Sequence, residues 1–298
     1  MPATATQTRI QLKNILFATD FSWAANSAVP YVHEIAEHFG SRVLAVHIRP
    51  PVVNPMTYPT SWPVYIEAAE AENKKHRSDL LAQFPGDTEV IIEEGDVRAL
   101  LPAIVERKNI DLLVMGTHGR TGVPRFVLGS VAEEIFRKVA CPVLTVGPNS
   151  LASSAKTGEL REILFATDFT PESLAAFPYA LSLAQEFQAE LTLLHVIPEP
   201  KPGELVSPAD VSGAAEHRLR KLIPEDANDW CRADFLVERG EVGEKILDAA
   251  KRRKADLIVL GVSGEKGVPG ASTHLPVAVA HSVVAHAVCP VLTVRGQT

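Results

Sequence analysis

The sequence contains few cysteines and no segment typical of export or membrane insertion. Its 298 residues include only Cys141, Cys231 and Cys289, too few for a disulfide framework, and no Cys-x-x-Cys motif occurs. The polar residues 1–8 lack the charged start and apolar core of a secretory signal, and no run of about 18 apolar residues could span a bilayer. We therefore expect a cytoplasmic protein in a reducing compartment that does not bind a membrane.

The sequence also lacks an excess of basic residues. It has 29 lysines and arginines against 36 acidic residues, which gives a formal net charge of −7. Because nucleic acids and anionic membranes favour basic surfaces, neither is expected as a partner. The apolar content of 46% and charged content of 22% are typical of a globular protein, and the length indicates two domains that each bury a core.

Several catalytic motifs are absent as well. There is no His-Glu-x-x-His, no nucleophile elbow with a Ser-His-Asp arrangement, and no clustered Cys/His spacing that would hold a metal. Neither the Gly-Lys-Ser/Thr of a P-loop nor the Gly-x-Gly-x-x-Gly dinucleotide fingerprint occurs. We predict no catalytic residue and no metal ligand, so strong catalytic activity is not expected.

An internal repeat organises the chain. The seven residues from Ile15 return unchanged from Ile163, and the six residues from Cys141 return unchanged from Cys289. Both matches have the same offset of 148 residues, which indicates a duplicated domain. We predict one domain at residues 1–148, a polar linker at residues 149–159 and a second domain at residues 160–298.

Each copy alternates short apolar runs with helical patterns. The first copy predicts strands at 14–18, 42–48, 89–93, 111–115 and 143–146, and helices at 22–39, 66–83, 97–108 and 130–139. This alternation predicts parallel β-α-β units, and therefore an α/β fold of two tandem five-stranded parallel sheets with helices on both faces. Ligands of such sheets bind at the carboxyl ends of the strands.

A glycine-rich stretch after the fourth predicted strand has the composition of a phosphate cradle. Gly116 and Gly119 follow the strand, and Gly129 and Ser130 precede a helix. Glycine lets a ligand approach backbone N–H groups, and a helix N-terminus favours an anion. The alternative is structural, because Ser130 and Glu133 also form a capping box and glycines are common in turns.

The ends of the first, second and fourth predicted strands carry the other candidate residues. Asp20 could accept hydrogen bonds from a ribose or an adenine amine, or it could cap the helix that begins near Ser22. Both interpretations of Asp20 remain open from spacing alone. Ile48 and Met115 could flank a base. His47 and its repeat His195 are expected to be structural, partly buried histidines.

These segments together resemble the universal stress protein family in its tandem form, whose domains have the adenine nucleotide alpha hydrolase-like fold. The resemblance rests on residues 15–21, 43–47 and 141–143 and on the Gly-x-x-Gly-x9-Gly-Ser spacing of the ATP-binding members. It implies ATP as ligand, with Mg²⁺ as an optional companion. Carried over to this chain, the binding positions are Ala18, Thr19, Asp20, Ile48, Met115, Gly116, Gly119, Arg120, Gly129, Ser130 and Val131. Arg120 has an alternative role as an exposed loop residue.

The second copy departs from the family pattern. Gly261 and Gly264 are retained, but His274 and Leu275 stand where the binding members have Gly-Ser or Gly-Thr. Their Cβ atoms would occupy the space where the backbone meets a phosphate. We therefore expect the second half to have lost tight ATP binding.

The resemblance also implies that the domains pair through their last strands, and it is compatible with a homodimer of whole chains. The function expected is a nucleotide-dependent regulatory module of the stress response that acts on an unidentified protein partner. Two alternatives remain: a slow Mg²⁺-dependent ATPase or phosphotransferase, and an interaction protein whose nucleotide sites are vestigial.

Overall fold

The structure is a computed structural model that describes residues 10–50, 62–117, 130–147, 150, 157–199, 208–225, 227, 231–262 and 277–296. The first half contains β1 (Asn14–Ala18), α1 (Trp23–Asn26), α2 (Val29–Phe39), β2 (Arg42–Arg49), α3 (Trp62–Gln83), β3 (Glu89–Glu94), α4 (Val97–Arg107), β4 (Leu112–Gly116), α5 (Ser130–Lys138) and β5 (Val143–Val146). The second half contains β6 (Glu162–Ala166), α6 (Pro171–Leu174), α7 (Phe177–Phe187), β7 (Glu190–Ile197), α8 (Pro208–Arg220), β8 (Ala233–Arg239), α9 (Val242–Arg253), β9 (Leu257–Val262), α10 (Val277–His286) and β10 (Val291–Arg295).

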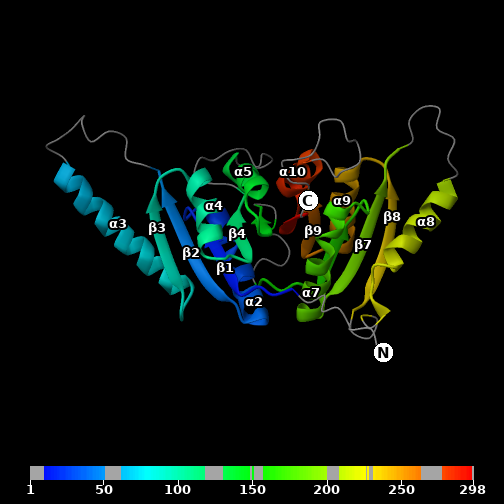
Figure 1. Ribbon diagram of the computed structural model, residues 1–298, viewed down its shortest axis with the longest axis horizontal. Coiled ribbons are helices and arrows are strands. Elements are labelled where there is room, and N and C mark those ends of the chain that lie inside the picture. The colour runs from blue at the N-terminus through cyan, green and yellow to red at the C-terminus, as the bar shows by residue number, and fades with distance from the viewer. Residues whose placement is uncertain are drawn as a thin grey trace.

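The strands form one ten-stranded sheet in the order β3-β2-β1-β4-β5-β10-β9-β6-β7-β8. All neighbours are parallel except β5 and β10, which pair antiparallel at the centre. Figure 1 shows the two halves side by side, with α3 and α8 at the outer ends. The predicted α/β fold of two tandem five-stranded parallel sheets, joined through their last strands, is confirmed.

The central pairing is symmetric about Leu144 and Leu292, which stand opposite each other. The Thr145 hydroxyl donates to the Val291 carbonyl at 3.1 Å, and the Thr293 hydroxyl donates to the Val143 carbonyl at 3.3 Å. Each half therefore supplies the same hydrogen bond to the other half. The last strands, which would otherwise expose unpaired backbone groups, thus become interior strands.

Helices cover both faces of the sheet because successive strand residues point to opposite sides. On one face, Leu16 of β1 belongs to a core with residues of α4, α5, α9 and α10. On the other face, Ile15 and Phe17 belong to a core with residues of α2, α3, α7 and α8. Both cores run through the two halves, so burial as well as backbone pairing holds the halves together.

The single helix predicted over residues 22–39 is wrong, because the chain forms two helices there. Pro30 lies in the first turn of α2, where proline is tolerated because the N–H groups of that turn have no partner within the helix. In one continuous helix over residues 22–39, Pro30 would lie in the interior and its missing N–H would break a hydrogen bond. The Ser27 hydroxyl donates to the Ala24 carbonyl at 2.6 Å and closes α1. Pro178 occupies the corresponding place in α7 and separates it from α6. The helix expected at 66–83 begins four residues earlier, at Trp62.

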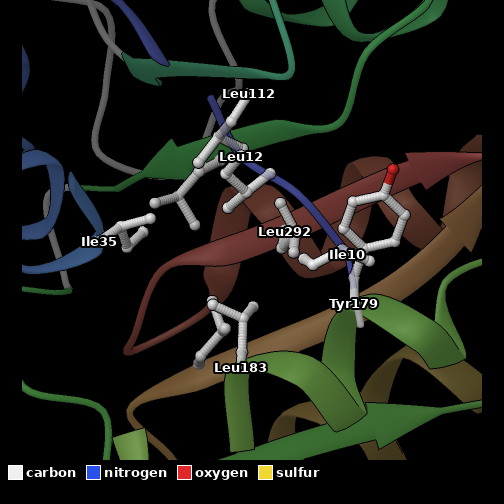
Figure 2. A pocket seen from close by; sticks show the side chains of 9 residues that line it. Ile10, Leu12, Ile35, Leu112, Tyr179, Leu183 and Leu292 are labelled. Carbon is white, nitrogen blue, oxygen red and sulfur yellow. The ribbon is translucent and has the colours of Figure 1, made fainter. Parts of the chain in front are cut away.

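The junction of the halves is filled almost completely by apolar side chains. A cavity of only about 10 Å³ remains between them, lined by Ile10, Leu12, Ile35, Leu112, Leu144, Tyr179, Leu183, Leu257 and Leu292. Figure 2 shows these side chains converging from several elements of both halves. The segment before β1 contributes to the junction, since the Ile10 amide donates to the Ser182 hydroxyl of α7 at 3.0 Å. An apolar space of this size does not serve as a ligand site.

All three cysteines are reduced and buried. Burial raises the pKa of Cys141 and of its repeat Cys289 to about 12, so both thiols stay protonated near neutral pH. Among the helices of the described residues, none combines the length and the apolar character that crossing a membrane requires.

Candidate functional site

The candidate site lies at the carboxyl ends of β1, β2 and β4, which are adjacent in the sheet. β1 is the middle strand, and its last residue, Ala18, stands beside Val46 of β2 on one side and Met115 of β4 on the other. Ile48 of β2 and Gly116 of β4 extend the same edge, and Thr19 and Asp20 continue from β1. The structure therefore brings these six predicted residues to one edge: Ala18, Thr19, Asp20, Ile48, Met115 and Gly116.

A tight turn after β1 fixes the position of Asp20. The Thr19 hydroxyl accepts a hydrogen bond from the Phe21 amide at 2.9 Å, and the Asp20 carboxylate accepts one from the Ser22 amide at 2.9 Å. Ser22 itself caps α1, because its hydroxyl accepts from the Ala25 amide at 3.2 Å. The interpretation of Asp20 as the helix cap is wrong. The Asp20 carboxylate instead stabilises the turn between β1 and the capping residue Ser22. Asp20 is partly exposed at the carboxyl end of β1.

The second half repeats this turn. The Thr167 hydroxyl accepts from the Phe169 amide at 2.9 Å, and the Asp168 carboxylate accepts from the Thr170 amide at 3.0 Å and from the Thr170 hydroxyl at 2.6 Å. The Thr170 hydroxyl then caps α6 by accepting from the Ser173 amide at 3.2 Å. The Thr-Asp pair is thus placed identically in both halves.

Phe21 and Phe169 adopt a left-handed backbone conformation, with φ of 61° and 64°. This conformation is strained for a bulky residue and persists only when neighbouring groups hold it. The Phe21 ring stacks on His76 of α3 with centroids 4.2 Å apart and meets His47 at 4.8 Å. The Phe169 ring meets His195 at 4.6 Å, and the Arg218 guanidinium of α8 lies 3.9 Å from its centroid. Sequence reasoning missed this feature, although the exact repetition of Thr-Asp-Phe was its signal.

His47 and His195 are structural residues, as expected. In each, Nδ1 donates a hydrogen bond at 2.8 Å to a backbone carbonyl, that of Thr19 or Thr167. Because a carbonyl can only accept, Nδ1 carries the proton. Burial is the largest cause that lowers the pKa of His195, which favours its neutral form. Both rings therefore support the turn that positions the adjacent aspartate.

Gly116 has a packing role that the sequence did not reveal. A Cβ added at Gly116 would lie 2.8 Å from the backbone of Ala24 and Ala25 in α1. A Cβ at Gly261 would lie 2.2 Å from the carbonyl oxygen of Glu172 in α6. The glycine at the end of β4 and of β9 is therefore required for the close approach of a short helix. Its presence in both halves needs no ligand to explain it.

The structure describes only some of the residues that are predicted to bind the phosphates. Gly119, Arg120 and Gly129 lie outside the described residues. Ser130 begins α5, as predicted, although only its backbone is described. Val131 is partly buried in the first turn of α5 and packs on the core shared with α4. The geometry of the cradle itself therefore stays a prediction.

The turns before α4 and α9 also correspond. The Asp96 carboxylate caps α4 by accepting from the Arg98 amide at 3.1 Å. The Glu241 carboxylate caps α9 by accepting from the Gly243 amide at 3.1 Å and the Glu244 amide at 2.6 Å. Both acids thus have a structural role as helix caps. Within the part of the chain that the structure describes, no cluster of three or more His, Cys, Asp or Glu side chains could hold a metal ion.

Comparison with known proteins agrees with this architecture. The sequence model of the Universal stress protein family matches twice, at residues 11–147 and 159–295. A curated Staphylococcus aureus (strain USA300) protein, named as belonging to the universal stress proteins, is 33% identical over 171 residues, covering 51% of this chain and 97% of that protein.

One solved structure has the same fold over nearly the whole chain. A universal stress protein from Archaeoglobus fulgidus DSM 4304 aligns over 97% of this chain and 100% of its own with a TM-score of 0.72, at 18% identity. A universal stress protein solved in complex with cAMP aligns over 46% of this chain and 98% of its own, at 23% identity and a TM-score of 0.32. The two family matches together span nearly the whole chain, and the chain therefore belongs to the universal stress protein family as a tandem pair of domains.

Proposed function

We propose that the chain is an ATP-binding regulatory module of the stress response, with ATP held in the domain of residues 1–148. The observation that supports this proposal most is the convergence of the Thr19–Asp20 turn with Ile48 and Met115 at one strand-end edge. In open α/β sheets such an edge is the usual ligand site. The family resemblance, which includes the Gly-x-x-Gly-x9-Gly-Ser spacing, supports ATP as the proposed ligand.

The described residues fit the base and ribose end of this ligand. The partly exposed Asp20 carboxylate is held in place by its hydrogen bond to the Ser22 amide, so it can accept from a hydroxyl or an exocyclic amine without reorganisation. Ala18, Ile48 and Met115 add apolar contacts for a planar base. Gly119, Gly129, Ser130 and the amide of Val131 would hold the phosphates, with Arg120 beside them.

A regulatory role follows from binding alone. ATP can shift the chain between two states if its affinity for them differs, and no turnover is required. The shared sheet and the two continuous cores connect the first half to the second. We propose that ATP acts on a partner through this connection. Slow Mg²⁺-dependent hydrolysis is the alternative use of the same site.

The first experiment is to denature freshly purified protein and quantify the released nucleotide per mole of chain. About one ATP per chain supports the proposal. Recovery of ADP together with Mg²⁺-dependent phosphate release would favour the ATPase. No released nucleotide, with no thermal shift on adding ATP, ADP or cAMP, would overturn nucleotide binding and favour an interaction protein with vestigial sites.

Matched variants then locate the site. Asp20→Asn should weaken ATP binding about tenfold in calorimetry, because an amide replaces a charged acceptor, while Asp168→Asn, its repeat, should leave ATP affinity unchanged. Gly129→Val should abolish binding by steric exclusion. Wild-type affinity in both Asp20→Asn and Gly129→Val would contradict the proposed site. Gly116 is unsuitable for this test because substitution there disturbs α1.

A further inference from the structure

An exposed face of α3 carries residues that packing within the chain does not explain. α3 lies at one outer end of the molecule and packs on the edge strand β3 (Figure 1). Its inward face is fixed by the fold, since Leu80 is fully buried and the His76 ring stacks on Phe21. Most other positions of the helix from residue 66 onwards are exposed. The core therefore accounts for only one face of α3.

Two large apolar side chains are exposed on this helix. Ile66 is 42% exposed and Leu81 is 43% exposed. Among the residues that the structure describes, Trp23 is the one other large apolar side chain that is exposed. Each such side chain would gain free energy from burial against a partner. Two of the three lie on one helix, so a single partner helix could bury both.

These two side chains belong to one stripe of the helix surface. The stripe, called the α3 stripe below, consists of Ile66, Glu70, Lys74, Arg77 and Leu81, all of which are exposed. Successive members are four, four, three and four positions apart, and this spacing keeps side chains on one face of an α-helix. The stripe extends over about 22 Å of the helix axis. It is therefore apolar at both ends and charged in the middle.

The charged groups of the stripe are available to a partner. Within the part of the chain that the structure describes, the side chains of Glu70 and Lys74 form no hydrogen bond or ion pair. The Arg77 guanidinium donates to the Val90 carbonyl at 3.1 Å through one nitrogen, and its other N–H groups can bind a further acceptor. The middle of the stripe thus offers an acid and two bases to a second surface.

The order of residues in the stripe is self-complementary. In an antiparallel helix pair with a two-fold axis, residues equally far from the axis on opposite sides stand at the same level. Ile66 and Leu81 are equally far from the point between residues 73 and 74, and so are Glu70 and Arg77. With the axis at that point, Ile66 of one copy meets Leu81 of the other, and Glu70 meets Arg77. The symmetry repeats both contacts, which gives two apolar contacts and two ion pairs.

The second half has no equivalent surface among its described residues. In α8, which lies at the other outer end (Figure 1), the Arg220 guanidinium binds Glu216 four residues earlier at 2.7 Å. This pair satisfies its charges within the helix. The described side chains of α8 include no exposed large apolar group. Association through α3 therefore ends at two copies, because α8 offers no matching stripe to a further one.

We propose that two copies of this chain associate through the α3 stripe, antiparallel and related by a two-fold axis. Ile66 and Leu81 supply the apolar contacts, and the Glu70–Arg77 pairs select this register and orientation, because opposite charges meet in it. Lys74 lies beside the axis, about one helical turn from Glu70 of the other copy. A single helix pair of this length buries less surface than a standard stable interface, so the dimer forms and dissociates with protein concentration. The association does not depend on the proposed ATP site, whose residues lie outside the stripe.

Analytical ultracentrifugation of the full-length chain over a range of concentrations tests this proposal. The wild type should show a monomer–dimer equilibrium. Glu70→Arg and Arg77→Glu should each weaken dimerisation about tenfold or more, because each sets like charges opposite one another in both ion pairs. An equimolar mixture of the two variants should recover dimerisation, since both pairs in the mixed dimer again join opposite charges. A wild type that stays monomeric, or a mixture no more dimeric than the separate variants, would overturn the proposal.

Further variants separate the interface from general effects of charge and folding. Lys75→Glu makes the same change of charge as Arg77→Glu at an exposed position about 200° further round the helix, and it should dimerise as the wild type does. Ile66→Lys and Leu81→Glu form a second complementary pair, at exposed positions without a hydrogen-bonding role. Each alone should weaken dimerisation, and their mixture should recover it. Equal losses in Lys75→Glu and Arg77→Glu, or wild-type dimerisation in Ile66→Lys, would contradict the α3 stripe as the interface.

Discussion

Single glycines decide how closely the short helices approach the sheet. Gly116→Ala and Gly261→Ala place a Cβ under 3.0 Å from the backbone of α1 and α6, so one element must move. We expect each substitution to lower the free energy of unfolding by about 1–3 kcal/mol without any ligand present. Urea denaturation checks this, with Gly147→Ala as the control, since its added Cβ would meet nothing closer than 3.6 Å. A Gly116→Ala variant as stable as Gly147→Ala would refute the packing role.

His195 makes the second half sensitive to acid. Its pKa is lowered in the folded protein, mainly by burial, from the ordinary value of 6.5. Between pH 6.5 and the lower pKa of the folded protein, the unfolded chain binds more protons than the folded chain. The free energy of unfolding therefore falls as the pH drops from 6.5 towards the folded pKa. We expect His195→Asn, which keeps a donor for the Thr167 carbonyl, to show a smaller loss of melting temperature between pH 7.5 and 5.5 than the wild type. An unchanged loss would exclude His195 as its source.

At the scale of residues, the sequence predicted which residues lie at the site better than it predicted their backbone conformations. It placed Asp20, Ile48 and Met115 at one edge because the carboxyl ends of parallel strands necessarily meet there. It did not assign Ser22 as the cap of α1, because Asp20 and Ser22 are both residue types that cap helices and lie two positions apart. It could not predict the positive φ of Phe21, because that conformation depends on ring contacts with His76 from a distant helix.

The acidic caps of α4 and α9 differ in the number of helix amides that they accept from. Asp96 satisfies one amide of α4, whereas Glu241 satisfies two amides of α9. We expect Asp96→Ala to cost about 1 kcal/mol of unfolding free energy and Glu241→Ala to cost more, because more helix amides lose their acceptor. Chemical denaturation of the two variants measures the difference. Equal losses would mean that water replaces the second Glu241 contact without cost.

At the scale of elements, the strands of the first half were predicted to within one residue at each end. Buried parallel strands appear as continuous apolar runs, which leaves little ambiguity. Helices were predicted less well, because their ends depend on tertiary packing. Pro30 and Pro178 were the available signal for the breaks before α2 and α7, since proline is tolerated in a first turn and disrupts a helix interior.

The whole molecule should unfold as one unit. The central β5–β10 pairing and the two continuous cores leave no boundary at which a half could open alone. We expect a single thermal transition, with amides of β1 and β6 exchanging at the same free energy of opening.

Leu144→Asp tests this cooperativity directly. Leu144 is 2% exposed, and a charge there would be buried at the symmetric centre of the sheet, at a cost of about 3 kcal/mol or more. We expect the variant to show two transitions as the halves separate, while Leu81→Asp, at a position 43% exposed, should keep one. A single transition in Leu144→Asp would mean that the two cores alone couple the halves.

Joining the two copies in one polypeptide changes what later mutations can achieve. When two identical chains pair through their last strands, every substitution appears on both sides of the symmetry axis. In this chain the β5–β10 pairing is intramolecular, so it does not depend on protein concentration, and each substitution affects one side only. Lysine could therefore replace leucine beside Gly240 while leucine remained beside Gly95. A symmetric scaffold thus carries two crevices that are free to evolve separately.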